Sequence, residues 1–195
     1  MVKEDWTIQR GPDSFELQGD TTFDGIQALR MNAELEQPGS VMTNDPSFDD
    51  SPSIFRCETK VNFDDSAYVG VVARFQDMDN FYYLATQEGT TDAAFVIVDD
   101  GSVSIIEDAD YSGFTENEWY DFRFTFWESS DVFYGRIERR EDDEDDWEIL
   151  GGTFSHSANR WSDEGGGVGV GIGVEDGRRF DLSLIHISEP TRQAE

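Results

Sequence analysis

The sequence predicts an all-β protein, an antiparallel two-sheet jelly-roll sandwich. Apolar residues alternate with polar ones at a period of two, in short runs, and Gly, Asp, Asn and Pro separate these runs. Helical periodicity is nearly absent. The chain has 195 residues, a length that all-β sandwiches often reach as one domain.

The runs themselves place the strands. Asp99 to Gly101 (DDG) separates two apolar runs, which is typical of a tight hairpin turn. The segments 128–131 and 141–146 are expected to be the tips of two later hairpins. We expect strands at residues 6–10, 15–18, 28–32, 40–44, 54–63, 68–76, 80–87, 93–99, 102–107, 119–127, 132–139, 147–151, 167–175 and 179–184.

Charge is the strongest global feature of the chain. It carries 43 acidic and 14 basic residues, a formal net charge of −29, and its only lysines are Lys3 and Lys60. Such a surface repels itself in dilute buffer. At about 1 M salt the Debye length falls to roughly 3 Å and the repulsion is screened. The composition therefore predicts a salt-adapted protein, and the lack of a basic footprint argues against nucleic acid as a partner.

Export and membrane signals are missing from the sequence. No stretch of about 18 apolar residues occurs, so membrane insertion is not expected. The first six residues, MVKEDW, lack the apolar segment of a signal peptide. Cys57 is the single cysteine, which excludes an intrachain disulfide, and its place in an apolar alternation predicts burial.

Three segments carry a family resemblance. Residues 68–84 (YVGVVARFQDMDNFYYL), 118–124 (EWYDFRF) and the glycine-rich 165–173 (GGGVGVGIG) occur in this order. Together they resemble the concanavalin A-like lectin/glucanase superfamily, in its laminin G-like branch, over roughly residues 5–181. The resemblance implies a jelly-roll sandwich. It also implies one of several functions, because the superfamily includes lectins, carbohydrate-binding modules, adhesive modules and glycosidases.

Strand alternation suggests a ligand face. Phe122, Phe124 and Phe126 form an aromatic stripe expected in the core, and the residues between them face the other way. The same reasoning on neighbouring strands places Arg56, Glu58 and Lys60 on that outer face. The candidate ligand-binding residues are Arg74, Arg123, Trp127, Tyr134 and Arg136. Aromatic rings and guanidinium groups there could bind a glycan. The alternative is a solvated ladder of cross-strand charge pairs, with Glu58 or Asp121 opposite arginine.

Catalysis has little support in the sequence. The Glu-x-Asp-x-x-Glu strand of the glucanase branch is not found, and the acidic run 141–146 is expected to be a solvated hairpin tip. No nucleophile elbow, zinc-spaced His/Cys cluster or phosphate loop occurs. His156, in a Ser/Asn-rich stretch, is expected in a surface loop.

The family resemblance also implies a possible structural calcium site. Relatives in the laminin G-like and glucanase branches often hold a structural calcium partly through an aspartate near the last strand, and Asp181 matches that position in order. An EF-hand reading of Asp77, Asp79 and Glu88 fails because Tyr82 stands where the loop requires glycine.

The C-terminal residues differ in character from the rest. The acidic bias fades in residues 182–195 (LSLIHISEPTRQAE), which resemble translated sequencing-adapter read-through. We therefore divide the chain into a sandwich domain, residues 1–181, and an artefactual tail, residues 182–195.

The sequence favours a carbohydrate- or glycoconjugate-binding module. We expect a monomeric domain of a larger extracellular or cell-surface protein. A sugar hydrolase of the same superfamily and a structural or adhesive sandwich that contacts protein are the alternatives.

Overall fold

A computed structural model describes the backbone of residues 6–10, 15–23, 26–32, 40–44, 54–63, 67–87, 92–110, 119–141, 146–158, 160–162, 166–174 and 179–188. Side chains are described for residues 56–58, 70–86, 93–110, 120–141, 146–158, 160–162, 166, 167 and 169. Within these ranges every regular element is a strand, and no helix is long and apolar enough to cross a membrane.

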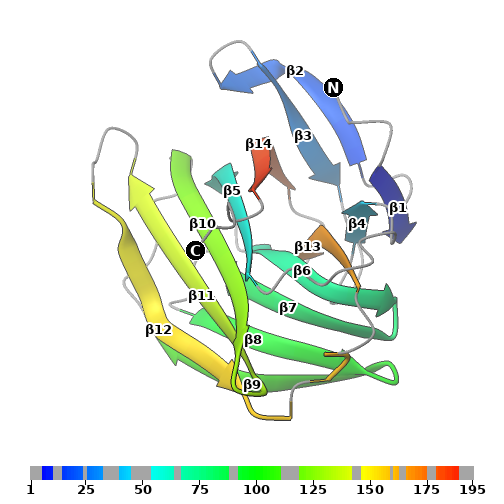
Figure 1. Cartoon of the computed structure of the whole chain (residues 1–195). Helices are drawn as coiled ribbons and strands as arrows, with labels where there is room; N and C mark the ends of the chain where they lie inside the picture. Colours follow the sequence, from blue (N-terminus) through cyan, green and yellow to red (C-terminus); the bar gives the residue numbers. More distant parts are fainter. Residues whose placement is uncertain are drawn as a thin grey trace, which may run out of the picture.

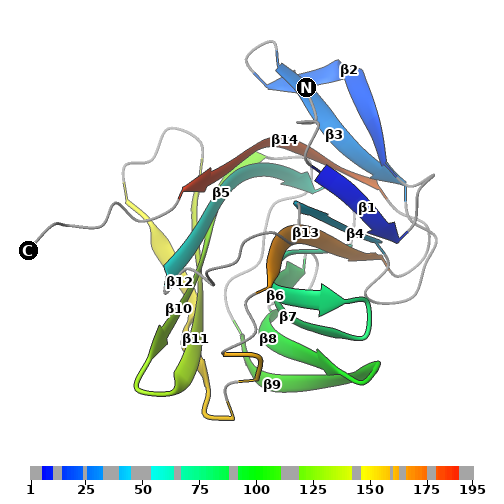
Figure 2. The same ribbon diagram turned by 45° about the vertical axis from the view of Figure 1, so that its right-hand side comes forward.

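The described residues contain fourteen strands, which form two antiparallel sheets of seven strands each. Figures 1 and 2 show how these strands are arranged. Sheet A has the order β1-β4-β13-β6-β7-β8-β9, and sheet B has the order β12-β11-β10-β5-β14-β3-β2. The strands are β1 (Trp6–Arg10), β2 (Phe15–Phe23), β3 (Ile26–Asn32), β4 (Ser40–Asn44), β5 (Ile54–Phe63), β6 (Ala67–Asp77), β7 (Asn80–Gln87), β8 (Asp92–Asp99), β9 (Ser102–Asp110), β10 (Trp119–Ser129), β11 (Val132–Glu141), β12 (Glu148–His156), β13 (Gly167–Val174) and β14 (Arg179–Ser188).

The expected jelly-roll sandwich is confirmed. Two of its hairpins turn as the sequence predicts, since Asp100 and Gly101 have φ values of 50° and 74°, and Ser130 and Asp131 have φ values of 53° and 63°. Two successive left-handed residues give the turn type whose twist matches that of paired strands. The Gly101 amide donates to the Asp79 carbonyl oxygen at 2.9 Å, which joins the β8–β9 turn to the β6–β7 turn.

The core lies between the sheets and is largely aromatic. Tyr82 of β7 packs on Phe133 of β11 with ring centroids 4.8 Å apart, and Phe95 of β8 lies 6.2 Å from Phe126 of β10. Edge-on and offset contacts of this kind add to the burial of apolar area. Gly135 of β11 faces Leu84 of β7 so closely that an added Cβ would lie 3.1 Å from the Leu84 Cδ1 atom.

Sheet A departs from the expected one-sided alternation. Phe81, Tyr83 and Ala85 lie on the face of β7 opposite Tyr82, and they are buried as well. They form a second apolar cluster with residues from β6 and β8, namely Val72, Phe75 and Val98. Strands β6 to β8 are therefore apolar on both faces, as strands of a sheet covered on both sides are.

The edge strands β9 and β12 lie side by side and close one side of the sandwich (Figure 1). The Ser155 amide of β12 donates to the Glu107 carboxylate of β9 at 2.9 Å. Beside it, Gly151 and Gly152 have φ values of 69° and 110°, where β12 shifts register against β11. An added Cβ on Gly151 would lie 2.5 Å from the Ala109 Cβ, so this position requires glycine for space as well as for backbone conformation.

Strand β14 includes residues 182–188. It pairs with β3 at Leu182 and with β5 as far as Ser188, which lies opposite Arg56. The apolar alternation of this segment suits a strand. The boundary at residue 181 and the artefactual origin of residues 182–195 stay predictions, and residues 189–195 lie outside the described residues.

Candidate functional site on the outer face of sheet B

The outer face of sheet B is a grid of side chains from β5, β10 and β11. Because alternate residues share a face and the three strands are in register, the outward residues fall into cross-strand rows. The three rows used below run from β5 across β10 to β11: Ile54, Trp127 and Tyr134; Arg56, Thr125 and Arg136; Glu58, Arg123 and Glu138. A fourth row holds Lys60, Asp121 and Arg140, and the side chains of Ile54 and Lys60 lie outside the described ones.

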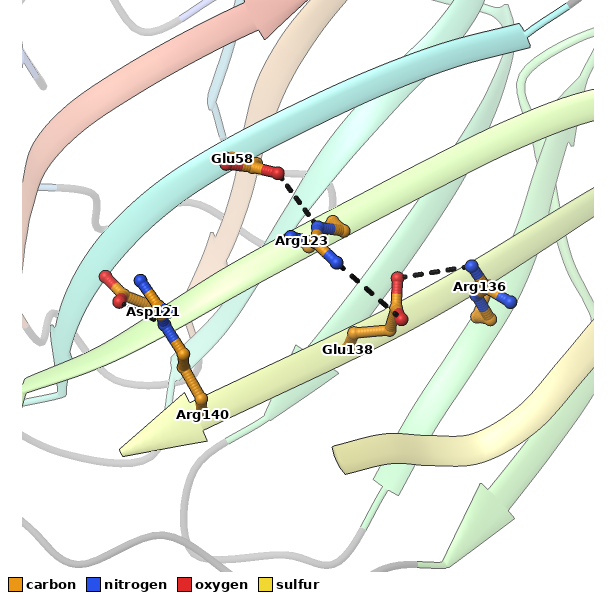
Figure 3. A network of polar contacts seen from close by, with 6 residues as sticks. All are labelled: Glu58, Asp121, Arg123, Arg136, Glu138 and Arg140. Atoms are coloured by element: carbon orange, nitrogen blue, oxygen red, sulfur yellow. Dashed lines mark hydrogen bonds and ion pairs between the residues drawn. The ribbon is translucent and has the colours of Figure 1, made fainter. Parts of the chain in front are cut away.

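Alternating charges hold this face together. The Arg123 Nε atom donates to Glu58 Oε1 at 2.8 Å, and its Nη1 atom lies 4.0 Å from Glu138 Oε1 (Figure 3). The Arg136 Nη2 atom lies 3.4 Å from Glu138 Oε2. The Arg123 side chain is 20% exposed and that of Glu138 is 9% exposed, so the pairs are partly shielded from water. The cross-strand ladder predicted as one alternative is therefore present.

Aromatic rings lie on the same face at both ends of the ladder. Trp127 and Tyr134 stack on each other, with centroids 5.2 Å apart and planes 9° from parallel. Both are half-buried. At the other end, the guanidinium groups of Arg123 on β10 and Arg140 on β11 lie 3.9 Å and 4.8 Å from the Trp147 ring centroid. Such contacts fix the orientation of rings and guanidinium groups in the absence of a ligand.

Four buried polar atoms gather on this face, in and beside the ladder. They are Arg56 Nε, Thr125 Oγ1, Arg136 Nε and Glu138 Oε2, and none has a hydrogen-bond partner within the part of the chain that the structure describes. Glu138 Oε2 does lie 3.4 Å from Arg136 Nη2, so it is ion-paired without hydrogen-bond geometry. Buried polar atoms without partners are unusual in folded proteins and each calls for an explanation.

Four of the five sequence-predicted ligand residues come together here, and Arg74 does not. Arg74 belongs to β6 in sheet A, so grouping it with Arg123 on one face was wrong. It has a φ of 50° at a register shift, and the residues from Val71 to Phe75 are all buried. A bulge changes which face of the strand the following side chains point to, so alternation along β6 could not place Arg74 correctly.

The Arg74 side chain crosses the interior toward sheet B. It pairs with Glu128 of β10, donates from Nη1 to the Arg160 carbonyl oxygen at 3.0 Å, and lies 4.0 Å from the Phe133 ring centroid. It is 5% exposed. This arrangement stabilises the contact between the sheets and the segment around Arg160.

The sequence did not predict a polar network that lies beside Arg74. The Tyr82 hydroxyl lies 2.8 Å from His156 Nδ1 and accepts a hydrogen bond from the Arg160 amide at 2.9 Å. Burial raises the pKa of Tyr82, and burial together with the charge of Arg160 lowers the pKa of His156. His156 was expected in a surface loop, but it is the half-buried last residue of β12. The only signal in the sequence was its place after the apolar Phe154.

Two other predictions have different outcomes. Cys57 is buried as expected, and burial, with a smaller effect of the Glu58 charge, raises the pKa of its thiol to about 12. Asp181 lies in β14 opposite Arg30 and Asn62, but its side chain lies outside the described ones, so a calcium ligand there stays a prediction. Among the described residues, no three His, Cys, Asp or Glu side chains are grouped to hold a metal ion.

Comparison with solved structures supports the same fold, a two-sheet β-sandwich. A carbohydrate-binding module, CBM66 from Bacillus subtilis, superposes with a TM-score of 0.56 at 16% identity, over 94% of this chain and 95% of that one. A GH43 protein from Bacillus licheniformis superposes with a TM-score of 0.61 at 13% identity, over 95% of this chain.

Only part of the larger relatives is matched. This chain spans 37% of the Bacillus licheniformis protein and 24% of a bifunctional GH43-CE protein from Bacteroides eggerthii, which matches with a TM-score of 0.61 at 11% identity. No protein-family model and no curated protein matches the sequence. At these identities the comparisons establish the fold alone, and the laminin G-like branch is not singled out.

Proposed function

We propose that this chain is a glycan-binding module of a larger protein and that it binds on the outer face of sheet B. The observation that carries the proposal is the stacked pair of Trp127 and Tyr134 beside the ladder of Arg123, Arg136 and Glu138. Aromatic rings provide flat apolar surfaces for sugar C–H groups. Charged hydrogen-bonding groups beside them orient the hydroxyls, and such charge-assisted bonds are the stronger kind.

The ladder also reduces the cost of binding. Arginine and glutamate side chains lose substantial conformational entropy when a ligand immobilises them. Here ion pairs and ring contacts already restrain Arg123, with Glu58 on one side and Trp147 on the other. A cross-strand ladder and a ligand face are therefore compatible properties of the same residues.

The matched structures support the same function. One is itself a carbohydrate-binding module, and this chain corresponds to nearly its whole length. Others are GH43 proteins of which the chain spans a minor part, consistent with a module that accompanies other domains. We propose in addition that the module belongs to the laminin G-like branch, acts as a monomer outside the cell or on its surface, and works at high salt. The composition and the sequence resemblance are the basis for these last proposals.

A glycan array probed in about 2–3 M salt tests the proposal. We expect binding to at least one neutral oligosaccharide. We expect Trp127→Ala to weaken that binding by about 1–2 kcal/mol, the size of a lost aromatic contact. Val103→Ala, which truncates a side chain 51% exposed on the edge strand β9, serves as the control and should bind normally.

Two outcomes would contradict the proposal. If the folded protein binds no glycan on the array, the proposed glycan-binding function is wrong. If Trp127→Ala binds as tightly as the unmodified protein, the assignment of the binding site to the outer face of sheet B is wrong. A reducing-sugar assay on the same oligosaccharides separates binding from the alternative of hydrolysis, and we expect no sugar release.

A further inference from the structure

The unpartnered polar atoms around Thr125 indicate which class of glycan this face would bind. Arg56, Thr125 and Arg136 are direct cross-strand neighbours, and Glu138 lies two residues from Arg136 on the same strand face. On β10, Arg123 precedes this group and Trp127 follows it. The row around Thr125 thus lies between the aromatic pair and the row of Arg123.

The donors and acceptors in this group are mixed. The Nε atoms of Arg56 and Arg136 can only donate, Glu138 Oε2 as a carboxylate can only accept, and Thr125 Oγ1 can do both. Thr125 is 4% exposed and Glu138 is 7% exposed, so their polar atoms have little access to bulk water. A hydroxyl group donates one hydrogen bond and accepts others, so neighbouring hydroxyls on a sugar ring complement such a set.

An anionic group does not complement it. A carboxylate or sulfate would accept hydrogen bonds from the arginine Nε atoms, but it would face the negative charge of Glu138 on β11. Glu58 lies on the other side of β10, on β5. Like charges at short range in a partly buried site are unfavourable, and such contacts are a common way of rejecting wrong ligands. The acids of the next row, Glu58 and Glu138, also pair with Arg123, and Glu138 contacts Arg136 as well, so a carboxylate charge lies directly beside the arginines that flank Thr125.

We propose that the row around Thr125 selects uncharged sugars bearing adjacent free hydroxyls and rejects uronic and sulfated sugars. This inference rests on the proposed glycan-binding function and adds the ligand class to it. Glu138 is the residue that sets the charge preference, and Thr125 adds a hydrogen bond without affecting that preference.

The test uses matched pairs of immobilised oligosaccharides that end in glucose or glucuronate and in galactose or galacturonate. Binding is measured in about 2 M KCl, because screening at this ionic strength removes long-range repulsion by the net charge and leaves contact effects. We expect the neutral member of at least one pair to bind at least tenfold more tightly than its acid.

Glu138→Gln should then lower the neutral-to-acid preference by about tenfold or more, in the range of one hydrogen bond to a charged group. Thr125→Val, similar in shape, should weaken neutral binding by about 3- to 10-fold with the preference unchanged. Glu148→Gln is the matched control. It removes the same charge and also breaks an arginine pair, Arg139 Nε to Glu148 Oε2 at 2.8 Å, but away from this face.

The possible failures are distinguishable. Acidic sugars that bind as tightly as their neutral partners, or a Glu138→Gln variant that keeps the wild-type preference, overturn the charge selection while glycan binding itself stands. If no member of any pair binds to the folded protein, both the proposed function and this inference fall. Thermal melts of each variant identify loss of binding that comes from loss of folding. If Glu138→Gln does not fold, the comparison of neutral and acidic sugars on the unmodified protein still tests the charge selection.

Discussion

Both sheets consist of antiparallel strands, but they differ in how many of their faces are buried. In sheet A, all six residues from Phe81 to Thr86 of β7 are buried, whichever way they point. In sheet B, β10 alternates buried Phe122, Phe124 and Phe126 with polar residues on the outer face. Alternation therefore identifies an outer face only in sheet B, where one face carries a charged ladder.

Two arginines show what this difference does to a charged side chain. Arg74 lies in sheet A, 5% exposed, and is held by Glu128, the Arg160 carbonyl oxygen and the Phe133 ring. Arg123 lies in sheet B, 20% exposed, and bonds Glu58 across the outer face. The first joins the two layers, and the second orders side chains on the outer face of sheet B.

The largest effects should come from apolar truncations on three of the four sheet faces. The Phe81 and Leu84 side chains point to opposite faces of sheet A, and the Phe124 side chain points into the core from sheet B. Phe81→Ala, Leu84→Ala and Phe124→Ala should each lower the free energy of unfolding by about 2–5 kcal/mol. Trp127→Ala should cost less than about 1.5 kcal/mol, the range of its stacking with Tyr134. Chemical denaturation of the four variants measures this. A mild effect of Phe81→Ala would show that sheet A has an open outer face.

Replacing the buried arginine comes next. Arg74→Met keeps the apolar stem but removes the ion pair with Glu128, and we expect a loss of about 2–4 kcal/mol of unfolding free energy. This is below the full range for a broken buried pair because Glu128 is 30% exposed. Adding Glu128→Gln should recover part of the loss. Arg123→Met, the control in sheet B, should cost about 1 kcal/mol or less, and equal losses would contradict the distinction between the two arginines.

Salt should stabilise the whole chain. With a net charge of −29, screening between 0.1 M and about 2–3 M KCl reduces self-repulsion in the folded state. We expect the melting temperature to rise by about 4 °C or more, which corresponds to roughly 1–2 kcal/mol for a domain of this size. Circular dichroism melts measure it. An unchanged or lower melting temperature at high salt would refute the predicted salt adaptation.

The two ion pairs should differ in their response to the same salt. A double-mutant cycle for Arg123 and Glu58 should give a coupling of about 0.2–1 kcal/mol at low salt, and it should approach zero at about 2–3 M. The coupling between Arg74 and Glu128 should persist, because screening reaches a buried pair poorly. If both couplings disappear together, Arg74 is more solvated than its surroundings indicate.

The smallest effect concerns pH at His156. Its pKa is lowered in the folded state, so between 6.5 and that lower value the unfolded state binds more protons, and stability falls as pH falls through this window. The charge of Arg160 adds to the effect of burial and that of Asp99 opposes it. The loss should stay under about 1 kcal/mol because the ring is partly solvated. His156→Gln keeps an acceptor for Tyr82 without titrating, so melts at pH 7.5 and 5.5 should show a smaller change for this variant.

Most of the fold could be predicted from the sequence because its strands are regular. The predicted bounds of the strands at Trp6, Ser40, Ile54 and Asn80 match the structure at both ends. Most ends that differ lie further out in the structure, whereas β12 begins one residue later and β13 ends one residue earlier than predicted. The Phe124 stripe and the outer position of Trp127 are also confirmed. Hairpins and alternation are local properties, and local patterns determine them.

The site was predicted only in part, for a physical reason. Assigning Arg74 to a face required knowing that β6 bulges at that residue and that it belongs to the other sheet. The partner of His156 required knowing that Tyr82, 74 positions away in sequence, lies beside it. Strand order and bulge position depend on long-range packing, which alternation along one strand does not report.

The meeting of β9 and β12 has a consequence for how copies of this protein behave toward each other at high concentration. The outer strand of a sheet can recruit a strand of another molecule and so start aggregation. The Glu107 carboxylate accepts a hydrogen bond from the Ser155 amide, and the register shift at Gly151 lies against Ala109 of β9. This border of sheet B is therefore an irregular and acidic template for a further strand. In brine, where screening no longer keeps acidic molecules apart, such a border limits strand-to-strand association by geometry instead of by repulsion.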